Sequence, residues 1–165
     1  MFYKKQCCNI DVQTLIMDIE KAILQKQPFK NETERLMVNL MFTVNWLSTQ
    51  QKQFFSEFGL TGKQYNILLI LKGAEGPIST AVIRKRMIDK MSDASRIVDR
   101  LEKKAFIKKV VSTVDQRKVD VSLTEVGTKT LEKINPKLES FQRDVTCLST
   151  KETILLNELL DKMRE

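Results

Sequence analysis

The sequence predicts a mainly α-helical fold with one small β-hairpin, of the α+β class. Three observations lead to this prediction. Apolar residues recur at helical spacing along most of the chain, two short β-rich runs stand close together within residues 106–123, and the segment between those runs is charged. A long amphipathic helix is predicted directly before the hairpin. A helix followed by a charged hairpin, in a basic chain, is the pattern typical of a winged-helix domain that binds DNA.

Length and composition favour a single globular domain. The 165 residues can bury one core, and 42% hydrophobic residues is ordinary for a soluble chain. No apolar run approaches the roughly 18 residues of a membrane span, so no membrane partner is expected. Lys4 and Lys5 are not followed by the apolar segment of a secretory signal, which predicts a cytoplasmic location. The net charge of +7 favours polyanionic partners, nucleic acid before an anionic membrane, with a charge that serves only solubility as the alternative.

The cysteines do not predict a metal site. Cys7 and Cys8 are adjacent, Cys147 is far away in sequence, and the chain has no histidine. We therefore expect free thiols, no bound metal and no cofactor.

Side chains that can cap helices mark where helices are expected to begin. In chain order these are Asn31 with Glu34, Thr61 with Gln64, Ser79, Ser92, Thr124, and Ser149 with Glu152. The first four helices are predicted to run to about residues 58, 72, 89 and 104, and a preceding helix from residue 9 to Pro28. Pro136 should kink or split the helix after Thr124.

Two of these helices, separated by a tight turn, predict a helix-turn-helix. The second carries one apolar face and one polar face; the apolar face comprises Ala94, Ile97, Val98 and Leu101, and the polar face comprises Ser92, Ser95, Arg96, Asp99 and Lys103. The hairpin follows directly, with strands predicted over 106–112 and 119–123 and a basic tip over 113–117.

The motifs in this half of the chain resemble the MarR family (multiple antibiotic resistance regulators). They are Ser92-Asp-Ala-Ser-Arg-Ile-Val-Asp-Arg-Leu-Glu-Lys-Lys, then Asp115-x-Arg117, then Val121-x-Leu123-Thr124-x-x-Gly127, together with helix starts at Leu60-Thr61 and Leu148-Ser149-x-x-Glu152. The resemblance runs from about residue 32 to the C-terminus. Ala105 stands where that family usually has glycine, and the first thirty residues are a longer lead-in than many members have.

The resemblance implies a homodimer of winged helix-turn-helix subunits. Residues 1–165 form a single domain in this reading: a lead-in over 1–30, dimerisation helices over 31–60 and 124–165, and the DNA-binding lobe over 61–123. It also implies repression, less often activation, of transcription at palindromic operators. Release from DNA would follow the binding of a small ligand or the oxidation of a thiol.

The predicted DNA contacts lie on the second helix and the hairpin. At the start of the helix, Ser92 and Ser95 could reach bases or phosphates, and Arg96 could fork onto a guanine. Lys108 and Lys109 are predicted to meet phosphates. Arg117 and Lys118 lie at the predicted wing tip, where Arg117 could enter the minor groove, and Asp115 is expected to be a structural residue of the turn. One or two cations of the run 84–86 could also touch the DNA backbone. A solvated helix face and an ordinary charged turn are the alternatives.

The sequence also suggests residues through which a small ligand could control DNA binding. Met41, Trp46 and Tyr65 are the candidate lining residues of a pocket, although methionines and aromatics at helical spacing are more often part of the core. Cys7 and Cys8 near basic residues leave a thiol-based redox sensor as an alternative. A winged-helix adaptor that binds protein rather than DNA is another. An enzyme is not expected, because no nucleophile with a base, metal cluster or phosphate loop is found.

Overall fold

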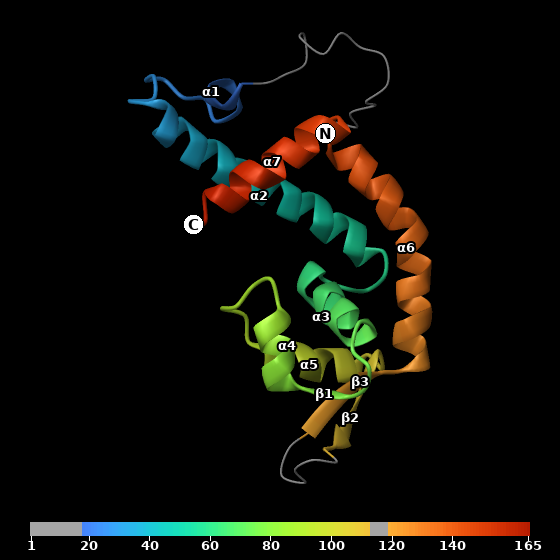
Figure 1. The fold of residues 1–165 in the computed structure, drawn as a ribbon. Coiled ribbons are helices and arrows are strands. Elements are labelled where there is room, and N and C mark those ends of the chain that lie inside the picture. The colour runs from blue at the N-terminus through green and yellow to red at the C-terminus, as the bar shows by residue number, and fades with distance from the viewer. Residues whose placement is uncertain (1–17, 113–118) are drawn as a thin grey trace. The chain divides into compact units, whose positions relative to one another are not determined.

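The computed structural model describes residues 18–112 and 119–165 of the chain (Figure 1). Helices dominate, and the strands form one antiparallel sheet in the order β1-β3-β2. The predicted α+β class is confirmed. In chain order the elements are α1 (Ile19–Ala22), α2 (Glu32–Ser56), α3 (Gly62–Lys72), β1 (Ile78–Ser79), α4 (Thr80–Arg86), α5 (Ala94–Lys103), β2 (Ile107–Val111), β3 (Val119–Leu123), α6 (Glu125–Val145) and α7 (Thr150–Lys162).

The chain forms two compact units. One comprises Trp46–Leu138, and the other comprises Met1–Asn45 together with Glu139–Glu165. The chain passes from one unit to the other inside α2 and again inside α6, so neither crossing is a loop. α6 is continuous through Pro136, which rules out the predicted split at that residue.

The hydrophobic core lies in the Trp46–Leu138 unit. It is built from α3, α4, α5, the sheet and the first half of α6, and its most buried side chains include Ile67, Leu68, Ile83, Leu101, Ile107, Val121, Leu131 and Ile134. Phe55 at the end of α2 stacks on Tyr65 of α3, with ring centroids 4.5 Å apart. Burying these side chains fixes the helix-turn-helix on a rigid base.

The sheet connects the wing to the helix-turn-helix. β2 and β3 form the predicted hairpin, paired from Ile107 opposite Leu123 to Val111 opposite Val119. β1 was not predicted, because two residues are too few to show an alternating pattern. Ser79 ends β1 and also caps α4, accepting a hydrogen bond from the Val82 backbone N–H at 3.4 Å. One residue therefore joins the sheet to the first helix of the pair.

Most of the predicted caps are confirmed. Thr61 with Gln64, and Ser149 with Glu152, form complete capping boxes at the starts of α3 and α7. Thr124 accepts the Gly127 backbone N–H at 3.1 Å. Asn31 accepts the Glu34 backbone N–H at 2.8 Å. The Glu34 carboxylate reaches one residue further back than predicted, to the backbone N–H of Lys30.

The ends of α2 and α5 use the same Schellman motif. After α2, the Leu60 N–H donates to the Phe55 carbonyl and the Gly59 N–H to the Ser56 carbonyl. After α5, the N–H groups of Phe106 and Ala105 donate in the same pattern to the carbonyls of Leu101 and Glu102, respectively. The motif needs a left-handed residue, and Gly59 has φ 67° while Ala105 has φ 58°. Ala105 thus occupies a position that favours glycine.

A second glycine position is fixed by a close contact. The Phe106 carbonyl accepts the Thr124 backbone N–H at 3.1 Å, where the chain leaves the hairpin for α6. A Cβ on Gly127 would lie 2.1 Å from the Phe106 carbonyl oxygen. Only glycine allows the first turn of α6 to approach β2 this closely.

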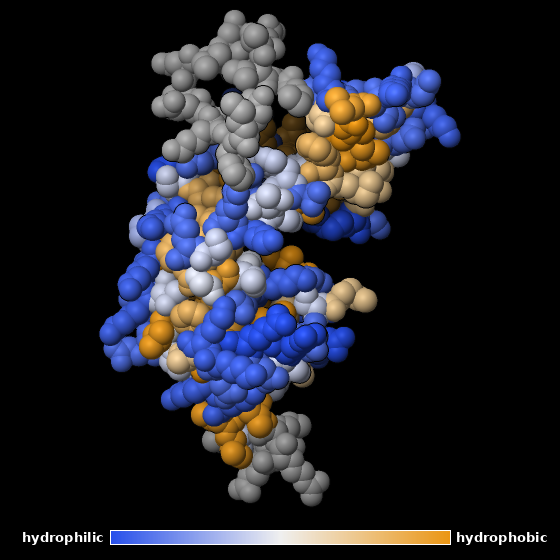
Figure 2. Space-filling model, turned by 180° about the vertical axis from the view of Figure 1, so that it is seen from behind, coloured by the Kyte–Doolittle hydropathy of each residue, from blue (hydrophilic) through white to orange (hydrophobic). Residues whose placement is uncertain are grey.

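The other unit exposes much apolar surface. α7 buries no residue, and the only buried residue of α2 is Phe55, which belongs to the core unit. The exposed large apolar side chains here include Leu36, Met37, Met41, Phe42 and Val44 on α2 and Ile154, Leu155, Leu156 and Leu159 on α7. Hydrophobic side chains, in orange, stand among hydrophilic ones, in blue, at the molecular surface in Figure 2. Apolar surface of this kind favours a further partner.

Candidate nucleic-acid interface

The helix-turn-helix consists of α4, a turn over residues 87–93, and α5. Ile83 and Met87 from the first half, and Ala94, Val98 and Leu101 from α5, are buried. The opposite face of α5 carries Ser95, Arg96 and Arg100, all exposed. The sequence predicts these two faces, although Ile97 of the apolar face is only partly buried and Arg100 was not among the predicted polar residues.

The cap of α5 differs from the prediction. Asp93 caps the helix by accepting the Arg96 backbone N–H at 3.1 Å, so the assignment of this cap to Ser92 is wrong. Ser92 and Asp93 are both good caps, and the sequence does not distinguish them. The hydroxyl of Ser92 is engaged elsewhere, and helix α5 begins one residue later.

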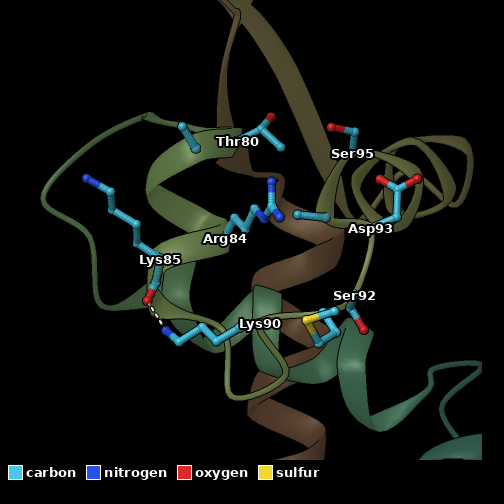
Figure 3. A pocket seen from close by; sticks show the side chains of 10 residues that line it. Thr80, Arg84, Lys85, Lys90, Ser92, Asp93 and Ser95 are labelled. Atoms are coloured by element: carbon cyan, nitrogen blue, oxygen red, sulfur yellow. Dashed lines mark hydrogen bonds between the residues drawn. The ribbon is translucent and has the colours of Figure 1, made fainter.

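An open recess lies between α4 and the start of α5 (Figure 3). Arg84, Lys85 and Lys90 bring three cations to its lining, against one carboxylate from Asp93. Figure 3 shows the Arg84 side chain extending from α4 into the space between Thr80 and the first turn of α5, whereas Lys85 points away. Lys90 donates through its ammonium to the Lys85 backbone carbonyl. The recess therefore presents a net positive charge beside the predicted DNA-reading end of α5.

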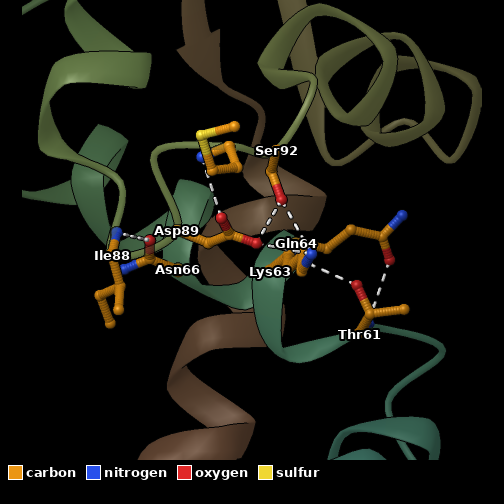
Figure 4. Close-up of polar contacts among 8 residues, drawn as sticks. Thr61, Lys63, Gln64, Asn66, Ile88, Asp89 and Ser92 are labelled. Carbon is orange, nitrogen blue, oxygen red and sulfur yellow. Dashed lines mark hydrogen bonds and ion pairs between the residues drawn. The ribbon is translucent and has the colours of Figure 1, made fainter.

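A polar cluster ties the turn to α3 (Figure 4). The Lys63 ammonium lies 2.7 Å from Asp89 Oδ2 and 2.8 Å from Ser92 Oγ, and the Ser92 hydroxyl donates to Asp89 Oδ2 at 2.7 Å. The Met91 backbone N–H donates to Asp89 Oδ1 at 3.0 Å. These hydrogen bonds, first of all the one from Lys63, lower the pKa of Asp89 to about 2. The cluster holds the Ser92 side chain toward α3.

The two lysines predicted for β2 lie in different surroundings. Lys108 is exposed. The Lys109 ammonium lies 2.6 Å from Asp99 Oδ1 and 2.8 Å from Glu102 Oε2, so it ties β2 to α5. The hydrogen bonds to Asp99 and Glu102 raise the pKa of Lys109, and Lys109 in turn lowers the pKa of Asp99. Two carboxylates therefore neutralise Lys109, whereas Lys108 in the same strand has no ion pair with any described residue.

The wing-tip residues Asp115, Arg117 and Lys118 lie outside the described residues. The strands on either side of them are described, and both belong to the core unit. Val121 in β3 is fully buried, which anchors the hairpin beside α5.

The three candidate ligand residues are not brought together within one unit. Tyr65 is buried in the core against Phe55, and burial raises the pKa of its hydroxyl. Met41 and Trp46 on α2 are 63% and 42% exposed, and they belong to different units. Tyr65 is thus a core residue here, as the alternative interpretation has it.

Cys147 is disulfide-bonded, so the expectation of a free thiol is wrong for this residue. Cys7 and Cys8 lie outside the described residues, and the redox alternative that rests on them stays a prediction. In the described part of the chain no three His, Cys, Asp or Glu side chains gather as a metal site. Over the same residues, no helix is long and apolar enough to cross a bilayer.

The sequence profile of the family described as transcriptional regulator SarA/Rot matches residues 49–134, which is more than half of the chain. The chain belongs to this family. Among curated relatives, the HTH-type transcriptional regulator PapX of Escherichia coli is 28% identical over 141 residues, covering 78% of this chain and 84% of PapX. The HTH-type regulator PecS of Dickeya dadantii is 26% identical over 150 residues, covering 84% and 90%.

Solved structures show the same fold. A MarR mutant from Escherichia coli in complex with operator DNA aligns with a TM-score of 0.73 at 22% identity, covering 83% of this chain and 99% of that one. BpsR of Bordetella bronchiseptica, whose DNA binding is regulated by 6-hydroxynicotinic acid, aligns at 0.72 and 22% identity, covering 84% and 99%. The predicted MarR-type winged helix and DNA-binding transcriptional regulator are confirmed. The relatives named here are transcriptional regulators rather than enzymes.

Several residues of the candidate interface were not identified from the sequence. Lys63 and Asp89 are far apart in sequence, and only the packing of α3 against the turn brings them together. Thr80 at the start of α4 and Lys90 in the following turn both line the recess. The predicted helix ran three residues too far, since α4 ends at Arg86. The run of basic residues over 84–86 was the one available signal for this recess.

Proposed function

We propose that this protein is a homodimeric repressor that binds palindromic operators through α5 and the wing and is released by a small ligand. The observation that carries the proposal is the arrangement at the start of α5. Exposed Ser95 and Arg96 stand next to a recess lined by the cations of Arg84, Lys85 and Lys90. A helix of this kind fits the major groove, where its N-terminal residues meet base edges and the cations meet phosphates.

Arg96 and Arg117 have separable roles in this proposal. Arg96 in the first turn of α5 reads a base, so Arg96→Ala should cost about 1–3 kcal/mol on a cognate duplex and less on random DNA. Arg117 at the wing tip enters the minor groove, so Arg117→Ala should weaken binding to both duplexes and reduce the salt slope by about one phosphate contact.

Titrations of both variants on cognate and scrambled duplexes, at several salt concentrations, test these roles. The cognate duplex is selected by the full-length protein from a random-sequence library. Lys72→Ala serves as the control, because Lys72 is an exposed cation at the far end of α3. Equal losses on both duplexes would make Arg96 a phosphate contact. Absence of duplex binding by the unsubstituted protein would favour the adaptor that binds protein instead.

The dimer is proposed from the exposed apolar side chains of α2 and α7. Leu155 and Leu159 are each 54% exposed on α7, and Met41 is 63% exposed on α2. A second copy would bury such surface and place two α5 helices about a two-fold axis, with half-sites about one helical turn of DNA apart. Leu155→Gln with Leu159→Gln should shift sedimentation toward monomer, whereas Lys151→Gln on the same helix should not. A wild-type protein that stays monomeric at micromolar concentration would contradict the dimer.

Ligand release is supported by the structural likeness to BpsR, whose DNA binding responds to 6-hydroxynicotinic acid. The effector of this chain would be a small molecule of its own. A screen of small molecules for loss of duplex binding, followed by the same test on the dimer variants, addresses this part of the proposal.

A further inference from the structure

The turn between α4 and α5 exposes two large apolar side chains. Met91 is 94% exposed and Ile88 is 86% exposed, the two highest values among the large apolar residues of the described chain. Met91 lines the recess described above, and Ile88 does not. A single exposed apolar residue needs no explanation. Two further observations indicate a role for Met91.

The first observation is that the backbone around Met91 is held in place. Its N–H donates to Asp89 Oδ1 at 3.0 Å, and the other oxygen of that carboxylate binds Lys63 at 2.7 Å. One step earlier in the turn, the Ile88 N–H donates to Asn66 Oδ1 at 3.3 Å. Lys63 and Asn66 belong to α3, whose buried face includes Ile67 and Leu68 (Figure 4). The Met91 side chain therefore projects from a fixed backbone, which lowers the entropy cost of a contact.

The second observation is the chemistry of the surroundings. The recess around Met91 has three cations, Arg84, Lys85 and Lys90, and one acid, Asp93. Such a lining selects a polyanion over an apolar protein surface. Met91 also lies two residues before the cap of α5, the end of the helix that faces base edges in the proposed complex. The apolar group that a DNA duplex offers at the major-groove base edge is the C5-methyl of thymine.

We propose that Met91 contacts a thymine methyl group in the bound operator and is a specificity-determining residue. The proposal rests on the proposed function and adds a direct readout of thymine to it. Asp89 and Lys63 act as positioning residues, since they hold the backbone from which Met91 projects. The flexible thioether suits the role, because methionine adapts its shape to an apolar partner.

The experiment replaces thymine by uracil, which pairs identically and lacks only the methyl group. A duplex selected by the full-length protein from a random-sequence library is remade with each thymine changed to uracil in turn. At one position in each half-site, the loss of the methyl should weaken binding by the wild type about fourfold, the value of one buried methyl-sized group. Met91→Ala should bind the thymine duplex about fourfold more weakly and should not respond to uracil.

Two variants serve as controls. Ile88→Ala removes another highly exposed side chain from the same turn but not from the recess, and it should keep the full response to uracil. Met91→Leu keeps an apolar side chain and should also keep that response. Because Met91 is almost fully exposed, the thermal unfolding midpoint should be the same in all of these proteins.

A wild type that binds thymine and uracil duplexes equally at every position would overturn the proposal. So would a Met91→Ala protein that retains the uracil penalty, or one that binds duplexes normally but fails in transcription, which would indicate a protein partner for this turn. Failure of the wild type to bind any duplex would instead overturn the proposed function. The two failures are therefore distinguishable.

Discussion

Ala105 and Gly59 offer a matched test of backbone strain, since they occupy the same position in two Schellman motifs. Ala105 has φ 58° and Gly59 has φ 67°. A Cβ on Gly59 would meet nothing within 4 Å, so Gly59→Ala changes the backbone preference without a clash. Ala105→Gly makes the opposite change at the end of α5. The two substitutions should shift stability in opposite directions.

The magnitude follows from two opposing contributions. The left-handed conformation costs an L-residue about 1–2 kcal/mol, which Ala105→Gly removes. Glycine also makes the unfolded chain more flexible, which lowers stability by about 0.4–1 kcal/mol. We expect Ala105→Gly to raise the free energy of unfolding by about 0.5–1 kcal/mol, and Gly59→Ala to lower it by a similar amount. For a chain of this size the shifts in Tm should be about 2 °C each.

The assay is thermal unfolding followed by far-UV circular dichroism, with urea unfolding to check that the m-value is unchanged. Both variants should keep the wild-type affinity for duplex DNA, since neither position lies among the predicted contacts. A lower Tm for Ala105→Gly, or shifts of the same sign in both variants, would refute the reasoning. It would mean that contacts of the Ala105 methyl, rather than its φ, govern stability at this helix end.

Three further predictions concern close contacts and charges. Gly127→Ala should destabilise the protein by at least about 2 kcal/mol, because its Cβ would lie 2.1 Å from the Phe106 carbonyl oxygen; Gly76→Ala, with open space, is the control in urea unfolding. The pKa of Asp89 is about 2, below its ordinary value, so its pairing stabilises the fold above about pH 4 and is lost as the pH falls through about 2. Asp89→Asn should therefore flatten the pH dependence of the unfolding midpoint over that range, and an unchanged dependence would disprove the pairing. Lys108→Gln should reduce the salt slope of DNA binding by about one phosphate contact. Lys109→Gln should weaken binding, because it removes the tie between β2 and α5. It should leave the salt slope unchanged, because Asp99 and Glu102 already neutralise this lysine. A salt slope reduced as much as in Lys108→Gln would show that Lys109 also meets phosphate.

The sequence was sufficient for those elements whose signals are local. The starts of α3 and α7 are set by capping boxes within four residues. β3 is set by alternation within five residues, and β2 by a short run of residues that favour strands. The same locality explains the mistaken cap of α5. Ser92 has the right chemistry, but Lys63, 29 residues earlier in the chain, engages its hydroxyl and leaves the cap to Asp93.

The residues of the candidate DNA-binding site show the same difference between local sequence signals and long-range packing. Arg96 could be placed on the outer face of α5 from helical spacing alone, and it is exposed. The different surroundings of Lys108 and Lys109 could not be predicted, because they depend on how β2 packs against the carboxylates of α5. Tyr65 likewise becomes a core residue only when α3 meets Phe55.

The sheet order β1-β3-β2 places β2 at an open edge. An edge strand offers unpaired backbone groups to other chains, and here Val111 of β2 and its partner Val119 of β3 are 64% and 46% exposed. Charged lysines on an edge strand discourage the addition of a foreign strand. We expect Lys108 and Lys109 to hinder such strand pairing, so substitutions that probe DNA binding here should introduce glutamine rather than valine or isoleucine.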